Sequence, residues 1–340
     1  MANNFLDLNG KFGDAVKLFT QYNFLYYLQE QAFGRLFVNE RALLSSPDTG
    51  SILTGSSGIL SGALYISTDV GCQHQHSVTQ GHNSTYWVNV DLGKVYRFTQ
   101  NGLEPISDRN GVHNLVYDVC SFYRKNVTTY DSPQGRGGIH GVYDYKNNEL
   151  VMTWRRRRGT SGNDFIPVGR HIDLTLVYNE LSGVFTTEYD IHPHLYFPFR
   201  GFYFSSNYTG SKQDFYVHLQ GNRGQYYGTF RNSYLKIVVE PDVEIEKVYD
   251  GTMMNINSEG VDILSLASCA TDYNSFVYNF ATDNRQRYRH GMLWFPVRGV
   301  TQTDRIRGKY MTQEYEVVNV GDKLCRITMI ENKFRVGYAT

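Results

Sequence analysis

Long apolar runs are missing from this sequence. No part of its 340 residues is an apolar stretch of about 18 residues, the length that predicts a membrane-spanning helix. Residues 1–20 also lack the basic start and the apolar run of a secretory signal. The chain is therefore expected to be made in a cytoplasm and not to insert into a membrane.

Charge is the second scarcity. Charged residues make up 19% of the chain, against about 25% in an ordinary soluble domain. Lysine plus arginine total 33, and aspartate plus glutamate also total 33. Net charge therefore predicts no general attraction to nucleic acid or to an anionic membrane.

Signatures of catalysis and of metal binding are absent too. The sequence has no phosphate-binding glycine loop, no Gly-x-Ser-x-Gly elbow and no His-Glu-x-x-His motif. Its four cysteines, Cys72, Cys120, Cys269 and Cys325, lack the short paired spacing of a zinc site and are predicted to be buried thiols. We expect no enzymatic activity, no cofactor and no bound metal.

Aromatic residues and glycine, by contrast, are abundant, with 27 Tyr, 20 Phe and 32 Gly. Aromatic side chains suit a pleated sheet, and glycine supplies the positive φ that many turns require. The composition therefore predicts an all-β fold. A tyrosine-rich surface favours contacts with proteins or sugars, but a tyrosine-rich core explains the same composition.

Four hairpins are predicted from alternating apolar residues around turn sequences. They span residues 86–98, 142–154, 173–189 and 215–230, with turns at Asp91–Gly93, Asn147–Asn148, Leu181–Gly183 and Asn222–Gly224. These turns recur at intervals close to the roughly 40–50 residues of a propeller blade. We therefore expect β-propeller-like antiparallel sheets.

Three segments are predicted along the chain: an irregular N-terminal segment (1–49), a propeller-like β domain (50–240) and a smaller C-terminal β domain (241–340). Within the first segment, a helix could be lined by Val16, Phe19, Phe24, Leu25 and Leu28, whereas Leu36–Val38 looks like a short strand. Within the last, residues 243–251 alternate like a strand that ends in a turn.

A C-terminal hairpin is expected around Gly321-Asp322, followed by a further strand near 334–338. Its strands, 315–320 and 324–330, carry apolar residues on both faces, whereas a solvent-exposed hairpin alternates more cleanly. The hairpin is predicted either to form a subunit contact or to pack on its own domain. Arg305, Arg307 and Lys309 precede it at a spacing of two and can share one strand face.

Arg155, Arg156, Arg157 and Arg158 form the most conspicuous basic cluster. Neighbouring residues of a strand point to opposite faces, so two of the four can share a surface. The segment after them, residues 159–164, has the composition of a mobile loop. We expect the arginines to lie on or beside an exposed loop, as solvated or interface groups or as DNA contacts.

Two pairs of histidines stand at i and i+2, His74 with His76 and His192 with His194. On a strand, this spacing would align both imidazoles on one face, a geometry that suits a metal ion. No acidic or cysteine partner stands at a recognisable interval. The four histidines are therefore predicted to be structural.

Several segments resemble the muzzle or nozzle (tail stabilization) proteins of crAss-like podoviruses. They are Gln29–Arg35, Asn39–Leu44, Gly71–Val78, Thr85–Val88, Lys94–Phe98, Leu103–Ser107, Gln225–Phe230 and Lys247–Gly251, in the family's order. These segments are hairpin and turn patterns and not a catalytic fingerprint, so no catalytic residue is carried over. Because proteins of this family are commonly longer, the chain resembles their C-terminal portion.

The resemblance implies a structural virion protein. Such a subunit would oligomerise around the tail axis and build or close the distal DNA channel. Its partners would be copies of itself and other tail proteins, with contacts to packaged DNA or host-surface glycan. Its location would be the virion tail, assembled in the bacterial host cytoplasm.

Two other functions compete with this interpretation. A glycan-binding or glycan-hydrolysing propeller would use aromatic platforms such as Trp87, Trp154 and Trp294, and carboxylates such as Asp91, Asp118, Asp144 and Asp190. A protein-interaction propeller unrelated to virions is the other alternative.

Overall fold

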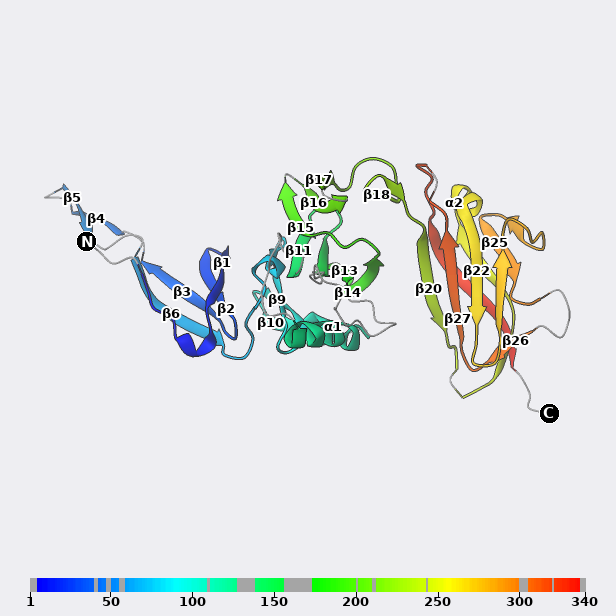
Figure 1. The fold of residues 1–340 in the computed structure, drawn as a ribbon, viewed down its shortest axis with the longest axis horizontal. Coiled ribbons are helices and arrows are strands. Elements are labelled where there is room, and N and C mark those ends of the chain that lie inside the picture. The colour runs from blue at the N-terminus through cyan, green and yellow to red at the C-terminus, as the bar shows by residue number, and fades with distance from the viewer. Residues whose placement is uncertain are drawn as a thin grey trace. The chain divides into compact units, whose positions relative to one another are not determined.

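The computed structural model describes most of the chain in two compact units, residues 1–219 and 220–340 (Figure 1). The described residues are 5–39, 42–46, 50–54, 59–108, 111–126, 138–155, 173–199, 201–209, 212–242, 244–299, 305–319 and 321–336. Each unit is described by itself below.

Both units are built from antiparallel strands, which confirms the all-β prediction. Within the described residues, the α-helices are α1 (His113–Asn126) in unit 1 and the short α2 (Ser258–Ile263) in unit 2. The closure of the sheets into propeller blades stays a prediction.

The described residues of unit 1 form four main sheets. The first has the order β1-β2-β3-β6 and the second β10-β9-β8-β7; the third has the order β11-β12-β13-β14 and the fourth β15-β16-β17. Their strands are β1 (Ala15–Gln21), β2 (Phe24–Gln29), β3 (Phe33–Asn39), β6 (Ile59–Ser67), β7 (Thr79–Gln80), β8 (Thr85–Asn89), β9 (Lys94–Thr99), β10 (Gly102–Pro105), β11 (Gly138–Asp144), β12 (Glu149–Arg155), β13 (Leu174–Asn179), β14 (Val184–Tyr189), β15 (Leu195–Phe199), β16 (Phe202–Thr209) and β17 (Lys212–Val217). A separate hairpin pairs β4 (Ala42–Ser46) with β5 (Gly50–Thr54).

Successive sheets of unit 1 share hydrophobic cores. The first and second sheets enclose Phe33 and Trp87 in one cluster. The second and third sheets, together with α1, enclose Trp154 in another. The third and fourth sheets share a smaller cluster that contains Val151 and Tyr203. Burial of such aromatic side chains supplies the dominant stabilisation of each junction.

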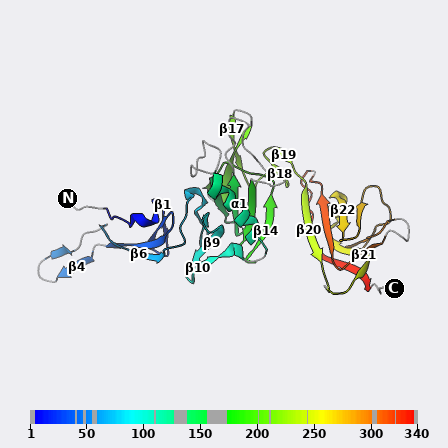
Figure 2. The ribbon, with the colours of Figure 1, turned by 60° about the horizontal axis from the view of Figure 1, so that its bottom comes forward.

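Unit 2 is a sandwich of two sheets (Figures 1 and 2). One sheet has the order β20-β27-β22-β23, and the other has the order β24-β25-β21-β26, with β28 also paired to β21. The strands are β20 (Ser233–Val239), β21 (Lys247–Ile256), β22 (Leu264–Ala270), β23 (Ser275–Asn279), β24 (Arg287–Arg289), β25 (Met292–Pro296), β26 (Ile306–Gly308), β27 (Met311–Val317) and β28 (Ile327–Val336). Both sheets contribute side chains to one core, with Tyr278 from the first sheet and Phe295 from the second.

A buried polar chain crosses the core of unit 2. The Tyr315 hydroxyl donates to Oε1 of Gln313 at 3.0 Å, and Nε2 of Gln313 donates to the Thr252 hydroxyl at 2.8 Å. Thr252 in turn donates to Oδ1 of Asn332 at 2.7 Å. The chain links β27 of one sheet to β21 and β28 of the other, and it fixes how the two sheets pack because a buried polar group without its partner is costly.

The first three predicted hairpins are confirmed as β8–β9, β11–β12 and β13–β14. The fourth is wrong, because within the described residues β17 pairs with β16 alone, and β18 (Gln225–Tyr226) pairs with β19 (Thr229–Phe230) instead. The N-terminal residues for which a helix was considered form β1 and β2 instead.

The expected C-terminal hairpin is also wrong. β27 lies between β20 and β22 in one sheet, whereas β28 pairs with β21 in the other, so the turn at Gly321-Asp322 connects the two layers. Apolar residues on both sides of this turn are explained by the shared sandwich core. Likewise, Gly251 does not end a strand: it lies within β21, where the Trp294 indole covers the space that a side chain would occupy.

The predicted division at residues 49 and 240 stays a prediction, but two pairings bear on it. β3, from the expected N-terminal segment, pairs with β6 beyond residue 50. β20, which precedes residue 240, pairs with β27 and so belongs to the sandwich of unit 2. Strand pairing therefore crosses both expected boundaries.

Candidate functional site

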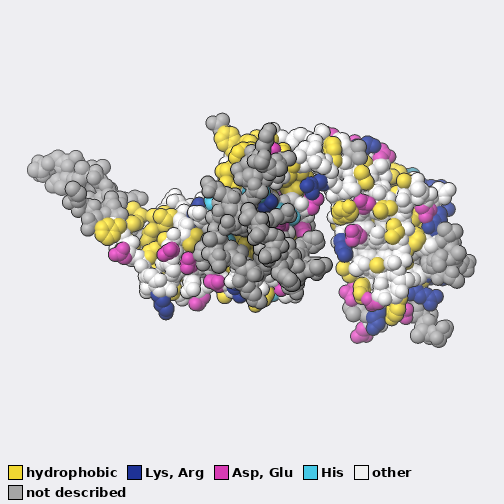
Figure 3. Space-filling model, in the orientation of Figure 1, with side chains coloured by type: hydrophobic (Ala, Val, Ile, Leu, Met, Phe, Trp, Pro, Cys, Tyr) yellow, Lys and Arg dark blue, Asp and Glu magenta, His cyan; other side chains and the backbone are white. Residues whose placement is uncertain are grey.

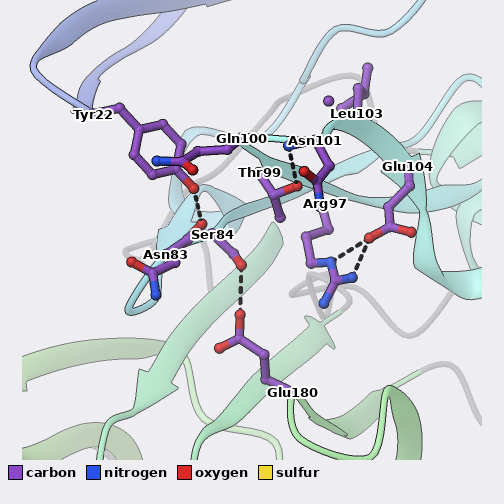
Figure 4. A pocket seen from close by; sticks show the side chains of 11 residues that line it. Tyr22, Asn83, Ser84, Arg97, Thr99, Gln100, Asn101, Leu103, Glu104 and Glu180 are labelled. Carbon is purple, nitrogen blue, oxygen red and sulfur yellow. Dashed lines mark hydrogen bonds and ion pairs between the residues drawn. The ribbon is translucent and has the colours of Figure 1, made fainter.

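A polar pocket in unit 1 lies where turns from three of its sheets converge (Figure 4). Its volume is about 610 Å³, and its lining side chains include Tyr22, Asn83, Ser84, Arg97, Thr99, Gln100, Asn101, Leu103, Glu104 and Glu180. Connecting segments are where binding residues concentrate, because a rigid sheet scaffold can hold them in place. We call this cavity the turn pocket.

The sequence determines each turn locally. Tyr22 and Asn23 join β1 to β2 with φ values of 50° and 63°, and two central residues with positive φ are typical of the tight turns that fit a hairpin's twist. Gln100 and Asn101 join β9 to β10, and Glu180 lies in the turn after β13.

Hydrogen bonds hold the first turn against the loop that precedes β8. The Tyr22 hydroxyl donates to the carbonyl oxygen of Asn83. Gln21 donates to the same carbonyl at 3.2 Å and accepts a hydrogen bond from the Thr85 hydroxyl at 2.6 Å. The Tyr22 ring is therefore fixed at its tip as well as at its backbone.

Glu180 is the best-anchored carboxylate of the pocket. The Ser84 hydroxyl donates to its Oε1 at 2.6 Å, and the Tyr143 hydroxyl donates to its Oε2. Partial burial raises the pKa of Glu180, but these hydrogen bonds and the nearby Arg97 charge outweigh burial and leave the pKa below its ordinary value. Glu180 is therefore ionised at neutral pH.

Arg97 and Glu104 form an ion pair across the β9–β10 ladder. Nε of Arg97 donates to Oε1 of Glu104 at 2.6 Å, and Nη2 donates to the same oxygen. The pocket contains one guanidinium and two carboxylates, so the net charge of the pocket is negative. An anion such as a DNA phosphate is therefore disfavoured here.

Replacing Glu180 by Gln should remove a pH-dependent part of the stability of unit 1. Because the folded pKa is lowered, Glu180 stabilises the fold above its unfolded pKa of about 4.3, and this contribution is lost as the pH falls through the folded value. Urea unfolding of the unmodified protein and of the Glu180→Gln variant between about pH 3 and pH 7 measures this contribution. The difference between their free energies of unfolding should shrink on acidification. A difference that stays constant with pH would contradict this role.

Some of the basic residues expected at contacts lie in the described part of the chain. Arg155 is half-buried at the end of β12, and residues 156–158 lie outside the described part of the chain. In unit 2, Arg307 and Lys309 are exposed and Arg305 is half-buried, while Ile306 and Gly308 between them are buried. This alternation is the one expected for side chains that share a strand face.

The paired histidines do not lie on strands. His74 immediately precedes the short 3-10 turn that contains His76 (Gln75–Ser77), and His192 and His194 precede β15. His74 and His194 are buried. In the described part of the chain, no group of three or more His, Cys, Asp or Glu side chains could hold a metal ion.

Burial contradicts the prediction that Trp87 and Trp154 serve as aromatic platforms of a glycan site. Trp87 and Trp154 are fully enclosed in hydrophobic cores and cannot contact a ligand, whereas Trp294 is half-buried. The carboxylates Asp91, Asp118, Asp144 and Asp190 do not line the turn pocket. Asp144 instead accepts backbone hydrogen bonds from Lys146 and Asn147 in the β11–β12 turn.

The cysteine prediction holds for three residues. Cys72, Cys120 and Cys269 are buried free thiols, and Cys325 is half-buried. Burial raises the pKa of the Cys120 thiol to about 12, so it is an inert core group. Within the described residues, no helix is both long and apolar enough to cross a membrane.

Comparison with known proteins defines the class of this chain. Residues 1–208, which include every residue of the turn pocket, match a family described as Crassvirus muzzle protein, so the chain is a structural protein of a phage tail. It belongs to the Crassvirus muzzle protein family. The chain is also 22% identical, over 263 residues, to the muzzle protein of Bacteroides phage crAss001.

The match to that relative covers 76% of this chain but only 17% of the phage protein. The resemblance seen in the sequence is thus confirmed at the level of the family. Its assignment to the C-terminal portion of longer family members stays a prediction.

Proposed function

We propose that this chain oligomerises with copies of itself around the tail axis and contacts other tail proteins, so that it helps to build or close the distal DNA channel. Family membership supports this proposal. The low and balanced charge of the sequence agrees with a structural role. Figure 3 shows charged side chains scattered over one face of the molecule and not gathered into one strongly charged field. No catalytic role is proposed.

The observation that carries the assembly proposal is the long edge strand β28. Its ten residues pair with β21 on one side, and within the described residues no strand pairs with its other side. Met329, Phe334 and Val336 on this strand are exposed. A long edge with exposed apolar side chains is a template for pairing with another chain.

The basic segment Arg305–Lys309 runs through β26, which pairs with the same central strand β21. Its outward face offers charged groups for pairing with acids of a neighbouring subunit. Arg155–Arg158 is proposed as a second contact segment, to a subunit or to packaged DNA.

Removing the C-terminal strands by truncating the chain after Thr312 would not test the assembly proposal. Such a cut removes most of β27 and all of β28, and β27 lies between two other strands of its sheet, so unit 2 would lose its fold. Point substitutions are therefore required.

Replacing Phe334 and Val336 with lysine should reduce the assembled mass in light scattering by at least half, because like charges along an edge strand oppose strand pairing. Replacing Arg305, Arg307 and Lys309 with glutamine should also reduce the assembled mass. Replacing Arg155–Arg158 with glutamine tests the second contact segment, and its readouts are assembly and DNA retention. Lys146→Gln in unit 1 is the matched control. Unchanged assembly in the folded edge variant would refute the role of β28.

A further inference from the structure

We propose that the turn pocket of unit 1 binds a neutral saccharide. This inference goes beyond the structural role in the tail and does not depend on oligomerisation. It rests on the shape, charge and donor–acceptor composition of the pocket and on its aromatic wall.

The charge of the pocket selects against acidic ligands. Glu180 is held ionised by its hydrogen bonds to Ser84 and Tyr143, and the charge of Arg97 is neutralised by its contact with Glu104. A phosphate, a sulfate or a sialic acid carboxylate would meet a net negative surface with no free cation. The ligand is therefore neutral or positively charged.

The donor and acceptor groups favour a polyhydroxyl ligand over a cation. A cation needs acceptors alone, whereas the pocket also presents the side-chain amides of Asn83, Gln100 and Asn101, and the hydroxyl of Thr99. Each sugar hydroxyl both donates and accepts, so it can bridge an amide and a carboxylate at once. Gln100 and Asn101 are exposed at the β9–β10 turn and can reach a ligand without a change of fold.

Tyr22 supplies the apolar wall that sugar recognition requires. The C–H-rich face of a pyranose ring packs on an aromatic face, while its hydroxyls contact the polar groups around it. The hydroxyl of Tyr22 is already bonded to the carbonyl of Asn83, so the ring is ordered before the ligand arrives. Less conformational freedom is then lost on binding.

The size of the pocket is compatible with a short oligosaccharide. Its volume of about 610 Å³ lies within the range of about 300–1,000 Å³ that is usual for small-ligand sites. The pocket is open to solvent on the side of the exposed Gln100 and Asn101, so the rest of a longer glycan could extend outward. The pocket is thus suited to the end of a surface polysaccharide.

The test uses the full chain and saturation-transfer NMR with a panel of neutral oligosaccharides that end in glucose, galactose, mannose or N-acetylglucosamine. Sialyllactose and a lysine-rich peptide are the acidic and basic counter-probes. At least one neutral sugar should give a saturable signal, and both counter-probes should give none. Binding of the peptide alone, or of no neutral sugar in the panel, would overturn the proposal.

Pocket variants then localise the binding. Gln100→Ala changes an exposed side chain and should weaken sugar binding by roughly 3–10-fold, which is the usual range for a single hydrogen bond. Tyr22→Ala should weaken it by at least about tenfold, whereas Tyr22→Phe keeps the ring and should stay within about threefold of the unmodified protein.

The matched controls lie on exposed surface of unit 2. They are Gln220→Ala for the amide and Tyr273→Ala for the aromatic ring, and both should leave affinity unchanged. Sugar binding that survives both Tyr22→Ala and Gln100→Ala in folded protein would move the site elsewhere and refute the assignment to this pocket.

Discussion

Gly71→Ala should destabilise unit 1 by about 3 kcal/mol or more, which is at the upper end of the cost of overpacking. A methyl group at Gly71 would lie 2.3 Å from the carbonyl oxygen of Glu30 and 2.4 Å from the backbone nitrogen of Gln31. Both contacts are with backbone atoms, so no side-chain rotation can relieve them. Urea unfolding followed by tryptophan fluorescence measures the change.

The backbone around Gly71 has little freedom to move away. Cys72 donates its backbone N–H to the carbonyl of Gln29 at 2.9 Å, and Asn89 of β8 donates to the carbonyl of Gly71 at 3.1 Å. The segment therefore ties the first sheet of unit 1 to the second, and its displacement would also shift Tyr22 relative to Asn83. Weaker sugar binding should accompany the loss of stability.

Gly62→Ala is the matched control for this prediction. It lies in β6 of the same first sheet, and an added methyl group would meet only the Phe37 ring, at an ordinary distance of 3.7 Å. Its effect should stay within about 1 kcal/mol, the usual scale of a glycine-to-alanine change at a site that tolerates it. Equal effects of the two substitutions would show that close packing at Gly71 is not the cause.

Local patterns predicted three of the hairpins of unit 1. In β8–β9, β11–β12 and β13–β14, the strands are consecutive and a short turn sets their pairing, so alternation and turn residues are sufficient. The sandwich of unit 2 could not be derived in this way. The partners of β27 are β20 and β22, which lie far from it in sequence, and no local signal specifies such pairings.

Helix α1 was missed because its composition resembles that of a strand. Its sequence contains valine, tyrosine and phenylalanine, which are common in sheets. The helical signal was nevertheless present, since Val116, Val119, Cys120 and Tyr123 recur at helical spacing and are all buried against the core. Counting matches to the helical period would have found it.

The turn pocket was also invisible in the sequence. Tyr22, Asn83, Gln100 and Glu180 belong to separate turns, and each looks like an ordinary turn residue. Only packing of the sheets brings these turns together. The tryptophans and aspartates that the sequence suggested for a glycan site were chosen by residue type, and burial or local turn bonding explains Trp87, Trp154 and Asp144.

Lys247→Met should lower the free energy of unfolding of unit 2 by about 2–4 kcal/mol, because it removes charge-assisted hydrogen bonds from a buried site. Lys247 begins β21 and is only 1% exposed. Its Nζ donates to the carbonyl oxygens of Asp242, Ile245 and Lys309, with lengths of 2.9 Å to Ile245 and 2.7 Å to Lys309. Methionine has a similar length but no donor, so three carbonyls lose their shared partner.

The position of Lys309 links this prediction to the proposed contact segment. Loss of the Lys247 hydrogen bond should free the backbone of Arg305–Lys309, so its amide protons should exchange with solvent faster than in the unmodified protein. Lys236→Met is the control, since its ammonium is exposed and lies 3.9 Å from Glu314 in a surface ion pair, a contact worth at most about 1 kcal/mol. If Lys247→Met destabilised unit 2 no more than Lys236→Met, the buried ammonium would not be what holds the Arg305–Lys309 segment in place.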